Sequence, residues 1–468
     1  MKKALFVIST SILLAVVTIL AGCHEQASTS KSGKPNVLII LTDQQTNDCL
    51  SLLGNPNLRT PYLDTLAQRG VYFTQSYCTS PVCGPSRSSL LTGRMPHETG
   101  IVWNSTNIDA SVPTIGQLFA EAGYNTAYAG KWHMPEGYPA QKNMDSVAGF
   151  RVLPFQSLAK SWEKGADTDG PIADAVVAYL NGYDDSKPFL LTVSLHNPHD
   201  ICFVPREPDG YAKASEINQP LPNLPANFNP KMKEPEFLEQ KRLMDHYGDE
   251  LLKTKDYTEA DWQAYLHHYY RFAEMVDVEI GKIWNALRAK GLDENTIIAF
   301  SSDHGDGAAS HRWAAKLSLY EEVITVPFGI SWPGKIPAGR VDRRQLVSGA
   351  DLTPTLCAYA GISDGQFTGK SLKEAIDNPD ASHRDYLVVQ LEDDKLDSTR
   401  HARLMRDQRF KYNVYNSGKN NEQLFDLWRD PGETQNLAYE SYYQPIKARL
   451  KANLRDWMKK NNDEALTL

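Results

Sequence analysis

From about Pro35 onward, short apolar runs rich in β-branched residues alternate with longer segments of helical periodicity. This alternation is typical of an α/β fold built on a parallel or mixed sheet. The run 36–41 is continuously apolar, as expected for a strand that is covered on both faces. Further strands are predicted over 126–129, 189–195 and 296–300. The sequence therefore predicts a large, mixed, mostly parallel sheet that lies between layers of helices.

Helix signals flank the predicted strands. Thr60 followed by Pro61 predicts a helix start, because proline suits the first helical position, and Gly70 predicts its end. Apolar residues over 115–122 form one stripe and predict a second helix. The segment 258–290 predicts a long helix with a cap at its first residue.

Two stretches depart from this pattern. Residues 200–257 are rich in proline, asparagine and charge, with one helical piece near 237–247, and long irregular insertions of this kind are commonly binding loops. The C-terminal part changes order and predicts strands over 386–390, 402–406, 410–414 and 424–427, then a terminal helix. We expect an α/β domain over 35–378 and a smaller antiparallel α+β subdomain over 379–468, because the chain is longer than one core supports.

The N-terminus carries a targeting pattern. Lys2 and Lys3 precede an apolar run that closes with Leu-Ala-Gly-Cys at Cys23, which is typical of an export signal with a lipobox. This stretch resembles bacterial lipoproteins, and the resemblance implies removal of residues 1–22, a lipid on Cys23, a tether over 23–34 and a place in the bacterial cell envelope. A single transmembrane anchor stays open as the alternative, because the apolar run approaches bilayer length.

Polar clusters follow four of the predicted strands, at Thr42 to Gln45, Gly130 to His133, His196 to Asp200 and Ser302 to Gly305. Ligands of open α/β sheets bind outside the carboxyl ends of the strands, so we expect these clusters to form one site. We predict a metal site at Asp43, Gln44, Asp303 and His304. Their donor atoms are mostly hard oxygens, which suit calcium or magnesium better than zinc.

The most specific motif runs from Cys83 to Arg94 and reads Cys-Gly-Pro-Ser-Arg-Ser-Ser-Leu-Leu-Thr-Gly-Arg. It resembles the maturation signature of the type I sulfatases, a family with the alkaline-phosphatase-like fold. The resemblance implies that Cys83 is oxidised to formylglycine by a formylglycine-generating or radical maturase. It also implies that the hydrated aldehyde is the nucleophile. Segments 347–355 and 424–437 extend the similarity over nearly the whole mature chain.

The resemblance also implies residue roles. A divalent ion, usually calcium with magnesium possible, would bind residue 83 together with the four predicted ligands. Gln44 departs from the pattern because many members have aspartate there, and His304 replaces a common asparagine. Substrate or catalytic roles are implied for Arg87, Lys131, His133, His199, His311, Arg312 and Lys316. Cations placed in advance in a dry pocket stabilise the spread negative charge of a sulfate-ester transition state.

The implied mechanism has two halves. One hydroxyl of the hydrated aldehyde at position 83 attacks sulfur, and the alcohol leaves with a proton from His199 or Lys316, so that a covalent sulfo-enzyme forms. The second hydroxyl loses its proton to a base, for which His133 is the candidate, and the aldehyde re-forms as sulfate is expelled. A serine at position 83 could not complete this last step.

The predicted substrate is a sulfated polysaccharide or oligosaccharide, either an ulvan-type algal glycan or a glycosaminoglycan, because the His-Asn-Pro-His-Asp stretch resembles bacterial carbohydrate sulfatases. Arg206 and Arg312 are candidates for binding a uronate carboxylate. Trp103, Phe203 and Trp313 could stack on sugar rings, although buried aromatic residues are the commoner case. The net charge of -8 argues against a nucleic-acid partner.

Three questions stay open from the sequence. A phosphonate or phosphodiester hydrolase of the same superfamily is the nearest alternative, disfavoured by the cationic pair Lys131 and His133. A glycan-binding lipoprotein with a silent site is the second alternative. The remaining cysteines match no zinc motif, and they are either reduced or joined in one disulfide: Cys49, Cys78, Cys202 and Cys357.

Overall fold

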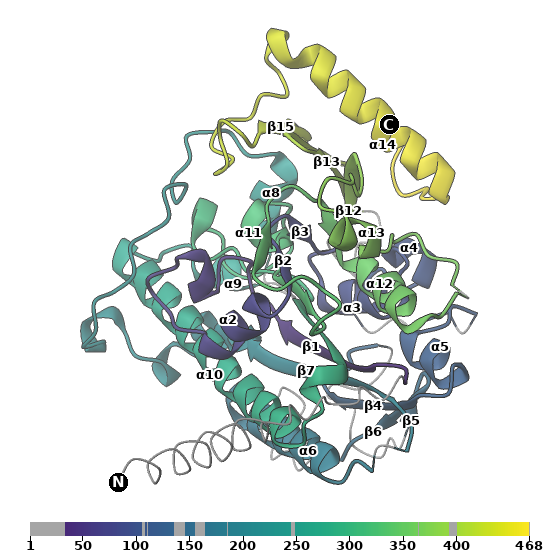
Figure 1. The fold of residues 1–468 in the computed structure, drawn as a ribbon. Helices are drawn as coiled ribbons and strands as arrows, with labels where there is room; N and C mark the ends of the chain where they lie inside the picture. The colour runs from purple at the N-terminus through teal and green to yellow at the C-terminus, as the bar shows by residue number, and fades with distance from the viewer. Residues whose placement is uncertain are drawn as a thin grey trace, which may run out of the picture. The chain divides into compact units, whose positions relative to one another are not determined.

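The computed structural model describes residues 33–467 except 105–107, 110, 135–145, 155–163, 185, 245–248, 364 and 393–399. The predicted signal peptide, Cys23 and most of the tether lie outside the described residues. Within the described ranges, no helix has both the length and the apolar character needed to cross a bilayer. Residues from Pro35 onward form one compact unit (Figure 1).

A nine-stranded sheet forms the centre of this unit, in the order β10-β2-β9-β8-β1-β7-β4-β6-β5. Its strands are β1 (Asn36–Asp43), β2 (Val71–Phe73), β4 (Asn125–Gly130), β5 (Ser146–Val147), β6 (Phe150–Val152), β7 (Phe189–Pro198), β8 (Thr296–Ser302), β9 (Phe328–Ser331) and β10 (Arg340–Asp342). Neighbours β8, β1, β7 and β4 are parallel to one another, whereas β9 is antiparallel to both β8 and β2. The predicted mixed, mostly parallel sheet is confirmed.

Helices cover both faces of the sheet, which explains why β1 is buried along its whole length (Figure 1). Val37, Ile39 and Leu41 face one apolar cluster, and Leu38 and Ile40 face another. The first cluster is built with α3 (Cys83–Thr92), α5 (Ile115–Glu121) and α12 (Leu352–Ala360). The second is built with α2 (Pro61–Gln68), α6 (Gly165–Asn181) and α10 (Glu259–Ala289).

The long predicted helix is α10, which starts at the expected cap. The Thr258 hydroxyl accepts a hydrogen bond from the Asp261 N–H, while the Asp261 carboxylate accepts from the Thr258 N–H. This reciprocal pair satisfies backbone donors that a helix start leaves without partners. The predicted strands over 126–129, 189–195 and 296–300 lie within β4, β7 and β8.

The C-terminal part forms a second, four-stranded antiparallel sheet, as predicted. It contains β12 (Tyr386–Glu392), β13 (His401–Asp407), β14 (Phe410–Tyr415) and β15 (Glu422–Asp426). One face packs on α14 (Gln444–Asn461) through Leu450 and Leu454. The other face shares an apolar cluster with residues of the larger domain, including Tyr77 and Trp313. The boundary predicted at residue 378 falls between α13 (Lys373–Asp377) and β12.

Among its described residues, the irregular insertion contains the short α-helices α7 (Phe203–Arg206), α8 (Glu236–Lys241) and α9 (Glu250–Lys253). The helix predicted near 237–247 is too long, because α8 ends at Lys241 and residues 242–244 are not helical, while 245–247 lie outside the described residues. Other short elements are α4 (Pro96–Thr99), α11 (Glu321–Ile324) and a two-stranded sheet of β3 (Ser76–Tyr77) and β11 (Val347–Ser348). All the cysteines that the structure describes carry free, buried thiols, so no disulfide joins them.

Candidate active site

Four adjacent parallel strands bring the predicted polar clusters to one edge of the sheet. Asp43 ends β1, Lys131 follows β4, His199 follows β7 and Asp303 follows β8. Because β8, β1, β7 and β4 are neighbours in that order, their carboxyl ends lie side by side. The structure brings these four residues together. Lys131 lies 2.5 Å from Asp43, Arg87 contacts both Asp43 and Asp303, and the charges of Asp43 and Lys131 act on His199.

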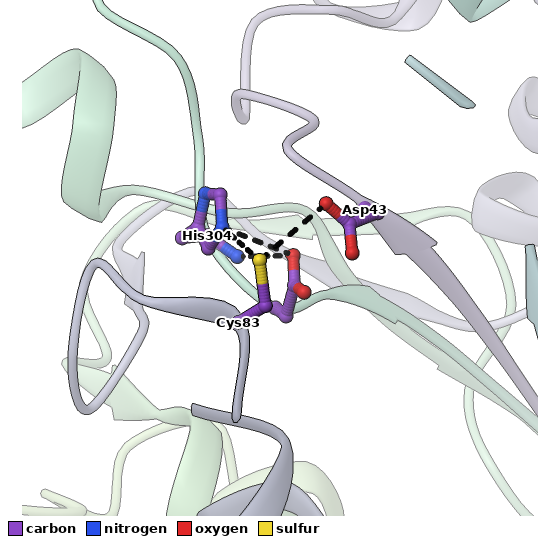
Figure 2. A group of neighbouring side chains, drawn as sticks. Asp43, Cys83 and His304 are labelled. Carbon is purple, nitrogen blue, oxygen red and sulfur yellow. Dashed lines mark hydrogen bonds and ion pairs between the residues drawn. The ribbon is translucent and has the colours of Figure 1, made fainter. Parts of the chain in front are cut away.

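Cys83 is the first residue of α3 and is fully buried. Its sulfur lies 3.0 Å from Lys316 Nζ, 3.2 Å from His304 Nε2 and 3.9 Å from Asp43 Oδ1. Figure 2 shows the Asp43, Cys83 and His304 side chains pointing toward one another. Asp43 and the segment that carries His304 and Lys316, far apart in the sequence, therefore converge on the cysteine that begins the 83–94 motif.

Positive charge around Cys83 activates its thiol. Burial and the Asp43 carboxylate raise the pKa of Cys83, but Lys131, Lys316 and His304 outweigh them and hold it well below its usual range. A thiol in such an electropositive setting ionises readily, unlike a structural buried cysteine. The same charges would stabilise any anionic oxygen placed at this position.

Arg87 joins the two carboxylates of the site. Its Nη2 lies 2.7 Å from Asp43 Oδ2 and its Nε 2.8 Å from Asp303 Oδ2. The guanidinium also donates to Ser194 Oγ in β7, and Lys131 Nζ lies 2.5 Å from Asp43 Oδ2. All of these groups are buried, so each charge has an opposite charge as compensation. Although burial lowers the pKa of Arg87, Asp303 and Asp43 raise it above its ordinary value.

The donor set fits a divalent cation. Asp43, Cys83, Asp303 and His304 each place one ligand atom within 4.8 Å of the others, and all four are buried. Burial and the neighbouring Asp43 raise the pKa of Asp303 to about 6, as expected for two carboxylates held close together. Two carboxylates and an imidazole are ligands that hard cations accept. These residues could hold the metal that the sulfatase resemblance implies.

Gln44 lies beside this cluster with its backbone in the left-handed region, at φ 68°. Its backbone N–H donates to Asp303 Oδ1, and its side-chain Oε1 lies 3.5 Å from Lys316 Nζ. The amide nitrogen donates to Asp306 Oδ2 at 2.8 Å, and the Tyr265 hydroxyl donates to the same carboxylate. The side-chain oxygen of Gln44 is therefore directed toward Lys316.

Sequence reasoning did not single out Asp306 or Tyr265. Asp306 lies in the same Asp-His-Gly-Asp stretch as two predicted ligands, so its position was a usable signal. Tyr265 lies on the buried face of α10, where a tyrosine among apolar residues is indistinguishable from an ordinary core residue.

The two predicted catalytic histidines are neutral in this environment. Burial lowers the pKa of His133 to about 4, despite a hydrogen bond with Cys83 that raises it. Burial and the charges of Lys131 and Lys316 hold the pKa of His199 well below its usual range. A neutral imidazole can accept a proton, so His133 is suited to the role of a base.

His311 and Arg312 lie in a different environment from the Cys83 cluster. The His311 ring stacks on Tyr320 with centroids 3.8 Å apart, and its Nε2 lies 3.3 Å from Asn227 Nδ2. Burial lowers the pKa of His311 to about 4. Arg312 is exposed, lies over Phe228 and donates to the Tyr257 carbonyl. Among described contacts, neither residue reaches Cys83, and their roles toward substrate stay predictions.

The aromatic residues proposed to contact sugar are buried, and Arg206, proposed to bind a carboxylate of the substrate, is held in ion pairs. Trp313 is fully buried, and Trp103 and Phe203 are 5% and 7% exposed. The reading of these aromatic residues as core is thus confirmed, and stacking of sugar on Trp313 is excluded by its burial. Arg206 is paired with Asp249 and Glu250 at 3.1 and 3.0 Å, so its charge is already compensated.

Comparisons with known proteins agree with this site. The Sulfatase family model matches residues 35–362, and the model of the N-sulphoglucosamine sulphohydrolase C-terminal region matches residues 309–460. A Delta 4,5-hexuronate-2-O-sulfatase of Bacteroides thetaiotaomicron is 32% identical, over 94% of this chain and 92% of its own. An ulvan-active sulfatase of Formosa agariphila is 30% identical, over 97% and 87%.

Solved structures give the same result. A 2-O GAG sulfatase superposes with a TM-score of 0.83 and 30% identity, covering 93% of this chain and 94% of its own. A phosphonate monoester hydrolase of Agrobacterium radiobacter shares the fold, with a TM-score of 0.74 at 23% identity over 92% of this chain and 96% of its own. The family model covers well over half of the sequence, and the resemblance carried by Cys83 to Arg94 is confirmed. The chain belongs to the sulfatase family of sulfuric ester hydrolases.

Proposed function

We propose that this enzyme hydrolyses sulfate esters on a sulfated polysaccharide or oligosaccharide, of the ulvan or glycosaminoglycan type, with a formylglycine made from Cys83. The observation that carries the proposal is the burial of Cys83 among Lys316, His304 and Asp43 at the first turn of α3. The relatives named hexuronate-2-O-sulfatase and ulvan-active sulfatase support a glycan substrate.

The nucleophile in this proposal is the hydrated aldehyde at position 83, and the cysteine sulfur of the structure stands in for one of its oxygens. A maturase of the formylglycine-generating or radical type carries out the oxidation. Arg87 holds Asp43 and Asp303 in place, so the carboxylates beside the nucleophile keep a fixed geometry. Lys316, 3.0 Å from the sulfur, stabilises the anionic oxygen that attacks.

A divalent cation would be held by Asp43, Asp303, His304 and the side-chain oxygen of Gln44. Calcium is the favoured ion, and magnesium is the alternative. When bound, it supplies positive charge that offsets the sulfate and the nucleophile. The carboxylates of Asp43 and Asp303, the side-chain oxygen of Gln44 and an oxygen of the formylglycine would supply four hard donors, which supports the preference for a hard cation. Removal of metal with a chelator and re-addition of Ca²⁺ or Mg²⁺ tests this choice, and recovery with Mg²⁺ alone would overturn calcium.

The chain's own residues then handle charge and protons. Lys131 and Lys316 bind the sulfate oxygens. Lys316 rather than His199 gives a proton to the leaving alcohol, because burial and the neighbouring lysines keep His199 neutral. His133, which burial keeps neutral, takes the proton from the second hydroxyl at position 83, so that sulfate is expelled and the aldehyde returns. The presence of Lys131 and His133 together disfavours a phosphonate hydrolase as the alternative function.

The decisive experiment measures free sulfate and phosphate released from ulvan, glycosaminoglycan and carrageenan oligosaccharides and from a phosphonate ester. Formylglycine at position 83 is first verified by mass spectrometry. We expect sulfate from one glycan class and no release by Cys83→Ala. The Cys83→Ser variant should stop after at most one turnover, because its sulfate ester has no second hydroxyl to expel sulfate. Multiple turnovers by Cys83→Ser, or phosphate release alone, would contradict the proposal.

We also propose that a lipid on Cys23 anchors the enzyme in the bacterial cell envelope, on the basis of the lipobox pattern. In a host with lipoprotein processing, the wild-type protein should incorporate a labelled fatty acid and should begin at Cys23, whereas Cys23→Ala should take up no label. A wild-type protein that is membrane-bound, unlabelled and still carries residues 1–22 would instead support an uncleaved transmembrane anchor.

A further inference from the structure

A surface hollow of about 530 Å³ lies beside the loop that carries Lys316. Its walls come from residues 228–234, from α8, α9 and the start of α10, and from His311 and Arg312. Phe228 and Trp262 provide aromatic walls, and Leu243 on the rim is 72% exposed. The volume falls in the range of sites that bind small molecules.

A second hollow, of about 390 Å³, adjoins the first because both are lined by Met232 and Lys233. It reaches the segment 434–440, where Tyr439 is 54% exposed. Together the two hollows form what we call the lateral groove, which runs from Arg312 to Tyr439. The exposed tyrosine ring offers an apolar face against which a sugar can pack.

The lateral groove is basic although the whole chain carries a net charge of -8. Four cationic side chains line the first hollow, against two carboxylates, and His311 adds no charge because its pKa is lowered to about 4. The cations are Lys233, Arg242, Lys255 and Arg312, and the carboxylates are Glu234 and Glu239.

Three of these cations lack a carboxylate partner. Arg242 is bound by Glu234 at 2.8 Å, whereas Lys233, Lys255 and Arg312 are exposed and make no ion pair with any described residue. The Arg312 guanidinium is oriented by Phe228 beneath it and by the Tyr257 carbonyl. A fixed planar guanidinium next to two mobile ammonium groups favours an anion, with a carboxylate bound in bidentate fashion.

The lateral groove and the Cys83 cluster are linked by one short loop. Arg312 lines the groove, and Lys316, four residues further along the same loop, contacts Cys83. Four residues of chain span at most about 14 Å. A ligand that is several sugars long can therefore reach from the groove to the active site.

We propose that the lateral groove binds a uronate or sulfated sugar of the substrate chain other than the sugar that loses its sulfate. Arg312 would receive the anionic group, Lys233 and Lys255 would add charge, and the exposed Tyr439 would pack against a sugar face. This inference rests on the proposed glycan sulfatase function, because only a polymeric substrate occupies both sites. It assigns the enzyme a preference for chains over single sugars.

The test compares kcat/KM on a hexasaccharide and on a disaccharide of the same sulfated glycan. The doubly substituted Lys233→Ala/Lys255→Ala enzyme should show a hexasaccharide-to-disaccharide ratio about ten-fold lower than wild type, because it loses two of the cations that face the additional sugars. Lys335→Ala removes an equally exposed lysine from the distant turn after β9 and should leave the ratio unchanged.

A binding measurement separates this inference from the proposed function. Cys83→Ala protein is titrated calorimetrically with a desulfated oligouronate hexasaccharide, with and without the two lysine substitutions and at two salt concentrations. Salt-sensitive binding that the substitutions weaken supports the groove even if wild type releases no sulfate from any glycan, an outcome that would defeat only the proposed function. Sulfate release with an unchanged ratio and unchanged binding would overturn the groove.

Discussion

The side-chain amide of Gln44 is held from behind by a buried carboxylate. Asp306 accepts hydrogen bonds from Gln44 Nε2, from the Tyr265 hydroxyl and from the Ala308 N–H, and it is fully buried. An aspartate in place of Gln44 would put a second negative charge against Asp306. The glutamine thus suits its surroundings, because it presents a donor to Asp306 and leaves a neutral oxygen for the proposed cation.

Substitution of Asp306 should therefore weaken metal binding without touching a ligand. In Asp306→Asn one acceptor oxygen becomes an NH₂ group, which cannot serve all three donors, so the Gln44 amide loses its fixed orientation. We expect about ten-fold weaker Ca²⁺ binding, a typical effect of removing a group that orients a ligand. Calorimetric titration of metal-free protein measures this, together with the calcium-dependent rise in Tm.

Tyr265→Phe is the matched control at this site. It removes one donor to Asp306 but leaves the acceptor for Gln44 intact, so its calcium affinity should fall by less than that of Asp306→Asn. If Gln44→Ala weakens calcium binding and Asp306→Asn does not, the positioning role of Asp306 is wrong.

At the scale of single elements, the start of α2 is capped by a side chain of another helix and not by its own cap residue. Thr60 is the cap residue, as the Thr-Pro pair predicts, but its side chain does not cap the helix. The free Tyr62 and Leu63 N–H groups instead donate to the Asp277 carboxylate, 3.2 and 2.7 Å away, from the buried face of α10. Helix starts need such acceptors, and here tertiary packing supplies one.

This carboxylate should make stability depend on pH. Burial, helped by Asp64 and Glu274, raises the pKa of Asp277 to about 7, above the ordinary value of 3.8. The folded state then holds this proton more tightly than the unfolded chain, so its stabilising effect is complete below pH 4 and is lost as pH rises toward 7. Asp277→Asn removes the titration.

Urea unfolding at pH 5 and pH 8 measures this effect. Relative to Asp277→Asn, the wild-type free energy of unfolding should fall by about 2–3 kcal/mol between the two pH values, since one pKa unit corresponds to about 1.4 kcal/mol. Other titrating groups are common to both proteins and cancel in the difference. Parallel changes in the two proteins would show that Asp277 ionises normally.

At the scale of the whole molecule, the sequence predicts the features that depend on local hydrophobic periodicity and on the residues at strand ends. Hydrophobic periodicity predicts the mixed central sheet and the antiparallel C-terminal sheet. The parallel order of the strands predicts that Asp43, Lys131 and Asp303 lie close together. The surroundings of His311 do not follow, because the chain turns there through a left-handed conformation at φ 54° and the ring packs on Tyr320. Contacts between distant segments, such as Tyr265 with Asp306, leave no local signal.

A buried ion cluster joins the C-terminal sheet to α11. Lys411 on β14 is fully buried and lies 3.0 Å from Glu321 Oε1 on α11 and 2.7 Å from Glu433 Oε1, in the segment after β15. Burial raises the pKa of Glu433 to about 8, whereas Lys411 and Arg406 hold the pKa of Glu321 below its ordinary value. The lysine of the C-terminal sheet therefore compensates the charge of a glutamate that precedes this sheet by more than 60 residues.

Lys411→Met should destabilise the whole protein, because it leaves Glu321 buried without its ammonium partner. Removing one member of a buried ion pair typically costs about 3–5 kcal/mol, and we expect the lower end because Glu433 can take up a proton. Lys451→Met is the control, since Lys451 is 41% exposed where it pairs with Glu422 and should cost less than about 1 kcal/mol. Urea unfolding followed by circular dichroism measures both. A single cooperative transition at lower urea for Lys411→Met would show that the two sheets unfold together. An early partial transition would contradict this, because it would show that the C-terminal sheet unfolds by itself and that Lys411 stabilises only that sheet.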